Sequence, residues 1–200
     1  MIRNALKQAI HLLGSRFVMA ETIEQAITQS RQHPVYCYSF DMLGEAALTQ
    51  ADANRYFDAY MASIADIAAA NKKKTIQDAS SISIKLSALH PRYEVANVER
   101  VIAELGPKVL QIAEHAKSLN VAVTIDAEEA DRLALSLDVI DRVMSEPALA
   151  GWDGFGIVVQ AFGPRATTVI DALYDIATRH DRRIMVRLVK GAYWDTEIKL

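Results

Sequence analysis

Cysteine, proline and glycine are all scarce in this sequence. Cys37 is the single cysteine among 200 residues, which excludes an intrachain disulfide framework and suits a reducing compartment. The five prolines and eight glycines do not cluster into a low-complexity tract, so fibrous and disordered classes fit poorly. We expect Cys37 to lie in the middle of a strand and to belong to the core.

An excess of one charge and long apolar runs are also missing. The 22 basic and 25 acidic residues give a net charge of -3, which disfavours a nucleic-acid-binding surface because such a surface needs concentrated basic residues. No apolar run approaches the ~18 residues of a membrane-spanning helix, and charged residues begin at Arg3. We therefore expect a cytoplasmic protein that binds no nucleic acid.

Extended apolar segments alternate with helical segments along most of the chain. The pattern predicts strands within 35–43, 81–89, 121–127, 154–162 and 183–194. It predicts helices over 2–13, 22–30, 52–70, 98–118, 131–144 and 167–179, with another beginning at Asp195. This alternation is typical of an α/β fold with a parallel sheet built from repeated βα units.

The two faces of the predicted strands differ in chemistry. Ile82 and Ile84 share one face, whereas Ser83 and Lys85 share the other, and the later strands repeat this asymmetry. An open sheet covered by helices on both sides would be apolar on both faces. The asymmetry favours a (β/α)8 barrel of the TIM-barrel family over an open doubly wound sheet, with a polar inner face at its mouth.

Four polar side chains fall on the inner face of successive strands: Lys85, Asp126, Gln160 and Arg187. Lys85 and Asp126 alone could form a structural ion pair. Four such residues at equivalent strand ends instead favour an active site for an anionic substrate or a cofactor with polar edges. The five histidines have no ligand spacing, so we predict no metal site, and we expect His90 to cap backbone groups in a loop.

The motifs at the strand ends resemble the proline dehydrogenase domain of the proline utilisation A flavoenzymes. The resemblance extends from about Phe17 to Leu200 and rests on YSFDMLGEAA, SIKLSALHPRY, TIDAEEADRL, GIVVQAF and RLVKGAYWDTEIK. It implies a barrel that holds FAD non-covalently and oxidises L-proline to 1-pyrroline-5-carboxylate by hydride transfer to flavin N5. It further implies that the electrons pass to a membrane quinone.

The resemblance also implies roles for individual residues. Arg187 would lie near flavin N5 and tune the cofactor electrostatically, Lys85 would bind the substrate carboxylate, and Asp126 would organise the cationic site. These three are the expected catalytic residues, and Tyr193 and Glu45 would lie with Lys85 and Asp126 near the substrate. The expected cofactor-binding residues are Arg187, Gln160, Val189, Lys190, Gly191, Ala192 and Trp194.

The family pattern has three strands more than this sequence provides. We therefore expect a helical arm over residues 1–34 and an incomplete barrel of about five βα units over 35–200 that stops before strands six to eight. These 200 residues alone are expected to be inactive. The alternatives are a Schiff-base lyase using Lys85 or Lys190, and a non-catalytic partial barrel. Peripheral contact with the inner membrane and a homo-oligomer stay open for the full-length protein.

Overall fold

Five parallel strands form one sheet in the computed structural model, which describes residue 14 and residues 17–71 and 75–197. The strands are β1 (Ser39–Asp41), β2 (Ser81–Ile84), β3 (Val123–Ile125), β4 (Phe155–Gln160) and β5 (Met185–Val189). Their order in the sheet is β1-β2-β3-β4-β5, the same as their order in the sequence. The predicted parallel α/β architecture is confirmed.

The sheet is strongly curled. Its edge strands β1 and β5 do not pair within the described residues, yet Nη1 of Arg187 on β5 donates to Oγ of Ser39 on β1 at 2.8 Å. In a flat five-stranded sheet these two strands would lie about 19 Å apart, since neighbouring strands are spaced by about 4.8 Å. An arginine could not reach that far, so the curvature agrees with the barrel family and not with an open sheet.

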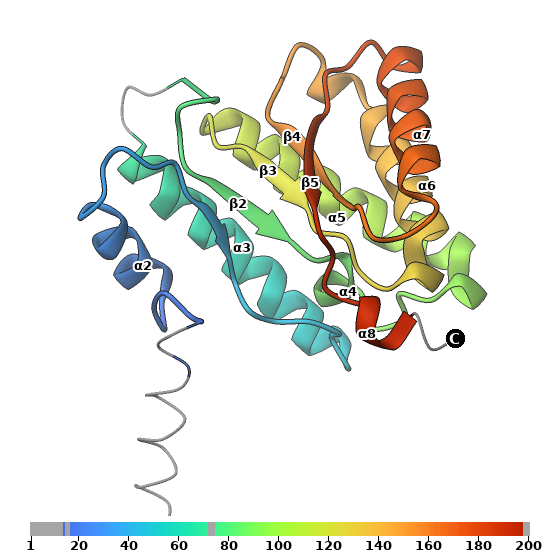
Figure 1. Ribbon diagram of the computed structural model, residues 1–200, viewed down its shortest axis with the longest axis horizontal. Coiled ribbons are helices and arrows are strands. Elements are labelled where there is room, and N and C mark those ends of the chain that lie inside the picture. Colours follow the sequence, from blue (N-terminus) through green and yellow to red (C-terminus); the bar gives the residue numbers. More distant parts are fainter. Residues whose placement is uncertain (1–13, 15–16, 72–74, 198–200) are drawn as a thin grey trace, which may run out of the picture.

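Helices follow the strands and cover the outer face of the sheet (Figure 1). Neighbouring long helices pack against each other in the order α3, α5, α6 and α7, which parallels the strand order. The helices of the described residues are α2 (Ile23–Ser30), α3 (Gln50–Ala70), α4 (Leu86–Leu89), α5 (Val98–Ser118), α6 (Leu133–Met144), α7 (Ala166–Arg179) and α8 (Trp194–Glu197). Short 3-10 turns occupy Val95–Asn97, Ala130–Arg132 and Pro147–Leu149.

Local signals in the sequence account for the helix boundaries. Thr49 and Asp52 form a reciprocal capping box that fixes the start of α3. Thr22 caps α2 by accepting from the backbone of Gln25. The predicted helix over 2–13 lies outside the described residues. In the described part of the chain, no helix combines the length and apolarity that spanning a membrane requires.

The core lies between the helices and the outer face of the sheet. Ile82, Ile84 and Val123 are completely buried there, and Ile125 is nearly so. Burial of each such side chain contributes roughly 1.5–3 kcal/mol to folding. The apolar face predicted from the alternation therefore forms the main contact between the strands and the helices.

Two details of the predicted elements are wrong. The second strand stops at Ile84, and Leu86–Leu89 is helical, because the Lys85 backbone N–H donates to the Tyr60 hydroxyl instead of a neighbouring strand. The first strand begins only at Ser39, so Cys37 lies before it and not in its middle. Cys37 is exposed, with Sγ 3.1 Å from the carbonyl oxygen of Asp78, and it is not a core residue.

Candidate active site

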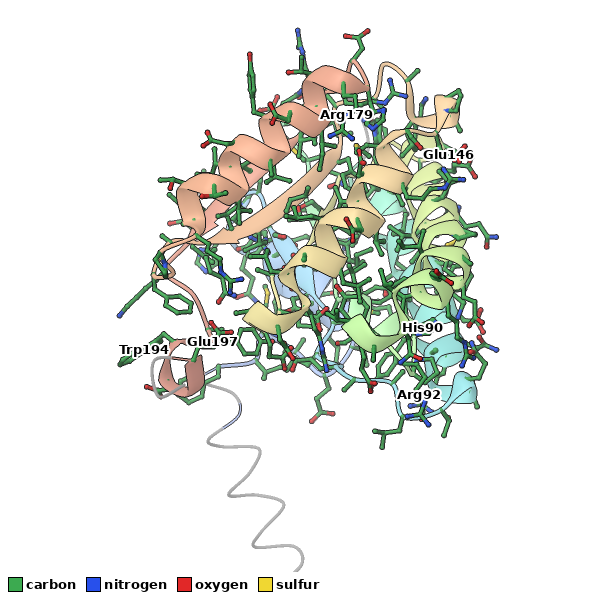
Figure 2. All side chains as sticks on the ribbon, turned by 90° about the vertical axis from the view of Figure 1, so that its right-hand side faces the viewer. His90, Arg92, Glu146, Arg179, Trp194 and Glu197 are labelled. Atoms are coloured by element: carbon green, nitrogen blue, oxygen red, sulfur yellow. The ribbon has the colours of Figure 1, made fainter. Side chains whose placement is uncertain are left out.

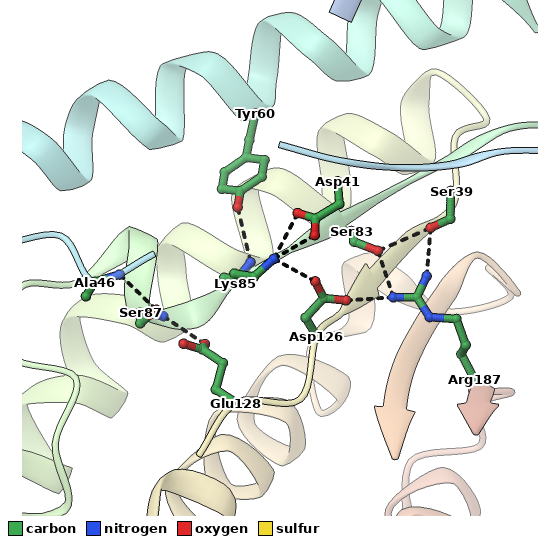
Figure 3. Close-up of polar contacts among 10 residues, drawn as sticks. All are labelled: Ser39, Asp41, Ala46, Tyr60, Ser83, Lys85, Ser87, Asp126, Glu128 and Arg187. Atoms are coloured by element: carbon green, nitrogen blue, oxygen red, sulfur yellow. Dashed lines mark hydrogen bonds and ion pairs between the residues drawn. The ribbon is translucent and has the colours of Figure 1, made fainter. Parts of the chain in front are cut away.

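A polar network lies on the inner face of the sheet at the carboxyl ends of the strands (Figure 3). Lys85 follows β2 directly, and its Nζ donates to Oδ1 and Oδ2 of Asp41 at 2.9 and 2.8 Å and to Oδ2 of Asp126 at 3.0 Å. Nη2 of Arg187 donates to the other Asp126 oxygen at 2.6 Å. Two carboxylates and two cations from four strands thus alternate in one chain of ion pairs.

Burial and charge have opposite effects on Lys85. Its side chain is 9% exposed, and burial alone would lower the pKa of its ammonium group. The adjacent Asp41 and Asp126 carboxylates outweigh that effect, so the pKa of Lys85 is raised. A nucleophilic lysine needs a lowered pKa, which argues against Schiff-base chemistry at Lys85.

Arg187 is more accessible than Lys85. Its guanidinium donates to Ser39, Ser83 and Asp126, while its side chain stays 39% exposed. A guanidinium carries five N–H donors, and these contacts use three. The remaining donors and the exposed surface leave Arg187 able to contact a ligand on the inner face.

Gln160 lies at the end of β4, but within the described residues it makes no hydrogen bond with the ion-pair network. Its Nε2 donates to the carbonyl oxygen of Glu128 at 3.0 Å, and its Oε1 accepts from the backbone of Ala192 at 3.0 Å. The side chain therefore joins the segment after β3 to the segment after β5. Of the predicted site residues, Lys85, Asp126 and Arg187 come together directly, whereas Gln160 positions the neighbouring loops.

The loop after β5 brings backbone close to the end of β4. Gly191 has a φ of +119°, and a side chain there would collide with the Phe162 ring. The carbonyl oxygens of Val189 and Lys190 accept from Ala161 and Phe162 at 2.8 and 3.1 Å. These contacts place the loop predicted to bind the cofactor beside the end of β4.

Two aromatic residues follow this loop at the mouth. Burial, and next the charge of Glu45, raise the pKa of the Tyr193 hydroxyl to about 12. Trp194 begins α8 and is 42% exposed. In Figure 2, Trp194 and Glu197 lie at one end of the molecule, whereas Arg179 and Glu146 lie at the other. Glu45 is itself exposed. The structure thus places Tyr193, Trp194 and Glu45 around the mouth.

His90 also lies near this end of the molecule but is not exposed to the mouth. Its side chain is buried, its Nδ1 accepts from the backbone of Arg92 at 3.1 Å, and its Nε2 lies 3.1 Å from Glu104. The predicted role as a loop histidine that caps backbone groups is confirmed.

Two acidic residues beside the network, Asp41 and Glu128, are not among the predicted site residues. Asp41 pairs in register with Ser83, so applying the inner-face alternation to the first strand would have placed it on the polar side. The Glu128 side chain is only 5% exposed, and this burial raises its pKa. Its Oε1 accepts from the backbone of Ser87 at 3.0 Å. Ser87 Oγ in turn accepts from Ala46 N at 3.1 Å, which ties the Glu45 loop to the segment after β3.

A cavity of about 470 Å³ adjoins the network between α6, α7 and the ends of β3 and β4. Its walls are largely apolar, with Leu133, Ile157 and Val169 among them, and Glu128 and Gln160 also line it. Asp126, which belongs to the inner-face network, is part of the cavity lining, so the cavity and the network share part of one wall.

Comparison with known proteins identifies the lineage of this arrangement. Residues 23–200 match the family model described as proline dehydrogenase. The chain is 49% identical over 201 residues to the bifunctional protein PutA of Klebsiella aerogenes, covering all of this chain and 15% of that protein. It is 30% identical over 184 residues to proline dehydrogenase 1 of Bacillus subtilis strain 168, covering 90% of this chain and 53% of that protein.

A solved structure gives the same result in three dimensions. A mutant of proline utilization A from Bradyrhizobium japonicum superposes with a TM-score of 0.84 at 55% identity, covering 99% of this chain and 20% of that one. The chain spans about 15% of the length of the PutA relatives that it matches.

Proposed function

Since this chain belongs to the proline dehydrogenase family, we propose that the protein carrying it oxidises L-proline to 1-pyrroline-5-carboxylate. The reaction breaks one C–H bond beside the ring nitrogen and the N–H bond, forms a C=N bond, and releases two electrons and two protons. When bound, FAD supplies the two-electron acceptor, and a quinone then takes the electrons onward. The observation that carries the proposal is the inner-face network of Lys85, Asp126 and Arg187 within the segment that matches the family.

The residues around β5 are chemically suited to the FAD ring system. Within the described residues, Arg187 keeps N–H donors that no hydrogen bond uses, and it holds a permanent positive charge on an accessible part of the inner face. A fixed cation there favours negative charge on the acceptor without needing to rearrange during the reaction. We propose that Arg187, Gln160, Trp194 and the 189–192 backbone hold the cofactor.

The opposite side of the network suits the substrate. An ammonium group is a compact charge for a carboxylate, and the raised pKa of Lys85 keeps it protonated. We propose that Lys85 binds the proline carboxylate, that Asp126 orients Lys85 and Arg187, and that Tyr193 and Glu45 border the substrate at the mouth. The direct contact between Lys85 and Asp126 supports these two roles.

Steady-state kinetics of the full-length protein test this assignment. Lys85→Ala is expected to raise the KM for proline at least tenfold, because the carboxylate loses its cationic partner. Circular dichroism should first show that the variant is folded, and Lys108→Ala, which removes a lysine that donates to the Leu89 backbone, is the matched control. An unchanged KM in folded Lys85→Ala would show that the substrate-binding role is wrong.

The arrangement of the whole protein is part of the proposal. We propose a helical arm over residues 1–34, a partial barrel over 35–200, and no turnover by these 200 residues alone, because β1 and β5 are not paired in the described sheet. We further propose a cytoplasmic enzyme that contacts the inner membrane peripherally to reach its quinone. A homo-oligomer is compatible with this arrangement.

A further inference from the structure

The Lys85 ammonium group is already occupied by carboxylates. Its Nζ contacts three carboxylate oxygens in the described structure (Figure 3). Oδ1 and Oδ2 of Asp41 lie at 2.9 and 2.8 Å, and Oδ2 of Asp126 lies at 3.0 Å. A substrate carboxylate that approaches Lys85 therefore competes with these two aspartates for its positive charge and its N–H donors.

The two aspartates are held very differently. Asp126 is 12% exposed and also accepts from Arg187 at 2.6 Å, so two cations fix its carboxylate. Asp41 is 38% exposed, and within the described residues it pairs with Lys85 alone. Separating Asp41 from Lys85 exposes the Asp41 carboxylate to water at little cost in free energy. Separating Asp126 from Lys85 would leave a largely buried carboxylate without one of its cationic partners, which costs more. Asp41 is therefore the carboxylate that can leave.

Charge balance leads to the same residue. Asp41, Lys85, Asp126 and Arg187 together have a net charge of zero, so an added substrate carboxylate makes the cluster negative. Without the Asp41 charge the cluster is positive, and an added carboxylate restores neutrality. A close opposite charge favours binding, and the effect is strongest where water is partly excluded.

We propose that Asp41 competes with the substrate carboxylate for the Lys85 ammonium group and thereby sets the KM for the substrate. The inference rests on the proposed function, since it takes the substrate to be a small carboxylate bound at Lys85. Asp41 occupies the anion position on Lys85 until the substrate displaces it. It acts on affinity and does not touch the reacting ring atoms.

Substitution of Asp41 in the full-length, FAD-containing protein tests the competition. Asp41→Asn and Asp41→Ser both remove the charge, and the second keeps the test available if the first does not fold. Asp153→Asn is the matched control, because Asp153 is also 38% exposed and pairs with one cation, Arg183, at 3.4 Å near the start of β4. The measured quantities are KM and kcat for proline and the calorimetric Kd of cyclopentanecarboxylate, a carboxylate on the same ring skeleton without the nitrogen.

Both Asp41 variants are expected to lower KM and Kd at least threefold, and Asp153→Asn is expected to change neither. Adding Lys85→Met to Asp41→Asn should abolish the gain in cyclopentanecarboxylate affinity. A KM or Kd that is unchanged or raised in folded Asp41 variants would overturn the proposal, because Asp41 would then only position Lys85. A gain in cyclopentanecarboxylate affinity that persists when Lys85→Met is combined with Asp41→Asn would overturn the proposal as well.

The two readouts separate this inference from the proposed function. If the unmodified protein does not oxidise proline, the proposed function fails while the cyclopentanecarboxylate titration still measures competition at Lys85. If proline is oxidised and the Asp41 variants show no gain in affinity, the competition fails and the proposed function stands.

Discussion

Strands β2 and β5 both direct a cation at Asp126, but they lie in very different surroundings. β2 pairs with β1 and β3, and Lys85 at its end is almost fully buried. β5 pairs only with β4 in the described residues, Arg187 is 39% exposed, and Val186 and Leu188 on its outer face are 45% and 59% exposed. The comparison separates a cation fixed by the fold from a cation left accessible to a ligand.

The largest difference between the two strands should appear on their outer faces. Ile84→Ala in β2 is expected to lower the free energy of unfolding by about 4 kcal/mol, because it leaves a cavity in a fully buried site. Leu188→Ala in β5 should cost about 0.5 kcal/mol or less, since that side chain is mostly exposed. Urea denaturation of both variants gives the two values. Equal losses of unfolding free energy in the two variants would contradict the distinction between the central strand β2 and the edge strand β5.

Removing each cation gives the next largest difference. Lys85→Met should lower the free energy of unfolding by about 3 kcal/mol, because the partly buried Asp126 loses one of its two cations and Asp41 loses its partner. Arg187→Met should cost about 1 kcal/mol or less, since its ion pair is partly exposed to solvent. Chemical denaturation of both variants at constant ionic strength gives the two losses of unfolding free energy. A larger loss for Arg187→Met would reverse the assignment of fixed and accessible cations.

The smallest effect concerns how α3 anchors the end of β2. Tyr60 is completely buried, and its hydroxyl accepts from the Lys85 backbone at 3.2 Å, so Tyr60→Phe should cost about 1–2 kcal/mol. Burial raises the pKa of Tyr60 to about 12, whereas the unfolded chain ionises near 10. The folded state therefore holds its phenolic proton longer, and stability falls as the pH rises from about 10 to 12.

A difference measurement isolates this contribution from the rest of the alkaline titration. The free energy of unfolding of the unmodified protein minus that of Tyr60→Phe should decline as the pH rises from about 10 to 12. Tyr174→Phe is the control, because Tyr174 lies on the surface and its substitution should change the free energy of unfolding by about 0.5 kcal/mol or less. A flat difference curve for Tyr60→Phe would contradict the effect of burial.

The alternation of side chains was sufficient to predict the parallel sheet and its polar inner face. Lys85, Asp126 and Arg187 lie in or directly after strands, where a period of two decides which face a residue occupies. The pattern does not single out Asp41, because β1 has only three residues within a predicted stretch of nine. A short strand offers little alternation from which to read its faces.

Residues in loops could not be predicted in the same way. Glu128 lies three residues beyond β3, and its position depends on the Ser87 backbone, 41 residues away in sequence. Gln160 was correctly placed at the end of β4, but its bond to Ala192 N depends on how the β5 loop returns to the sheet. Such contacts come from the tertiary arrangement, and no local pattern in the sequence encodes them.

The contact between Ser39 and Arg187 has a consequence for how the chain folds. Each pair of adjacent strands can form once a single βα unit has been completed, so most of the sheet can grow in the order of synthesis. The Ser39–Arg187 bond instead joins residues 148 positions apart and closes a far longer loop of chain. Loop-closure entropy increases with loop length, so this contact carries the greater entropic cost. The curl of the sheet is thus completed by a contact that cannot form until the fifth strand has arrived.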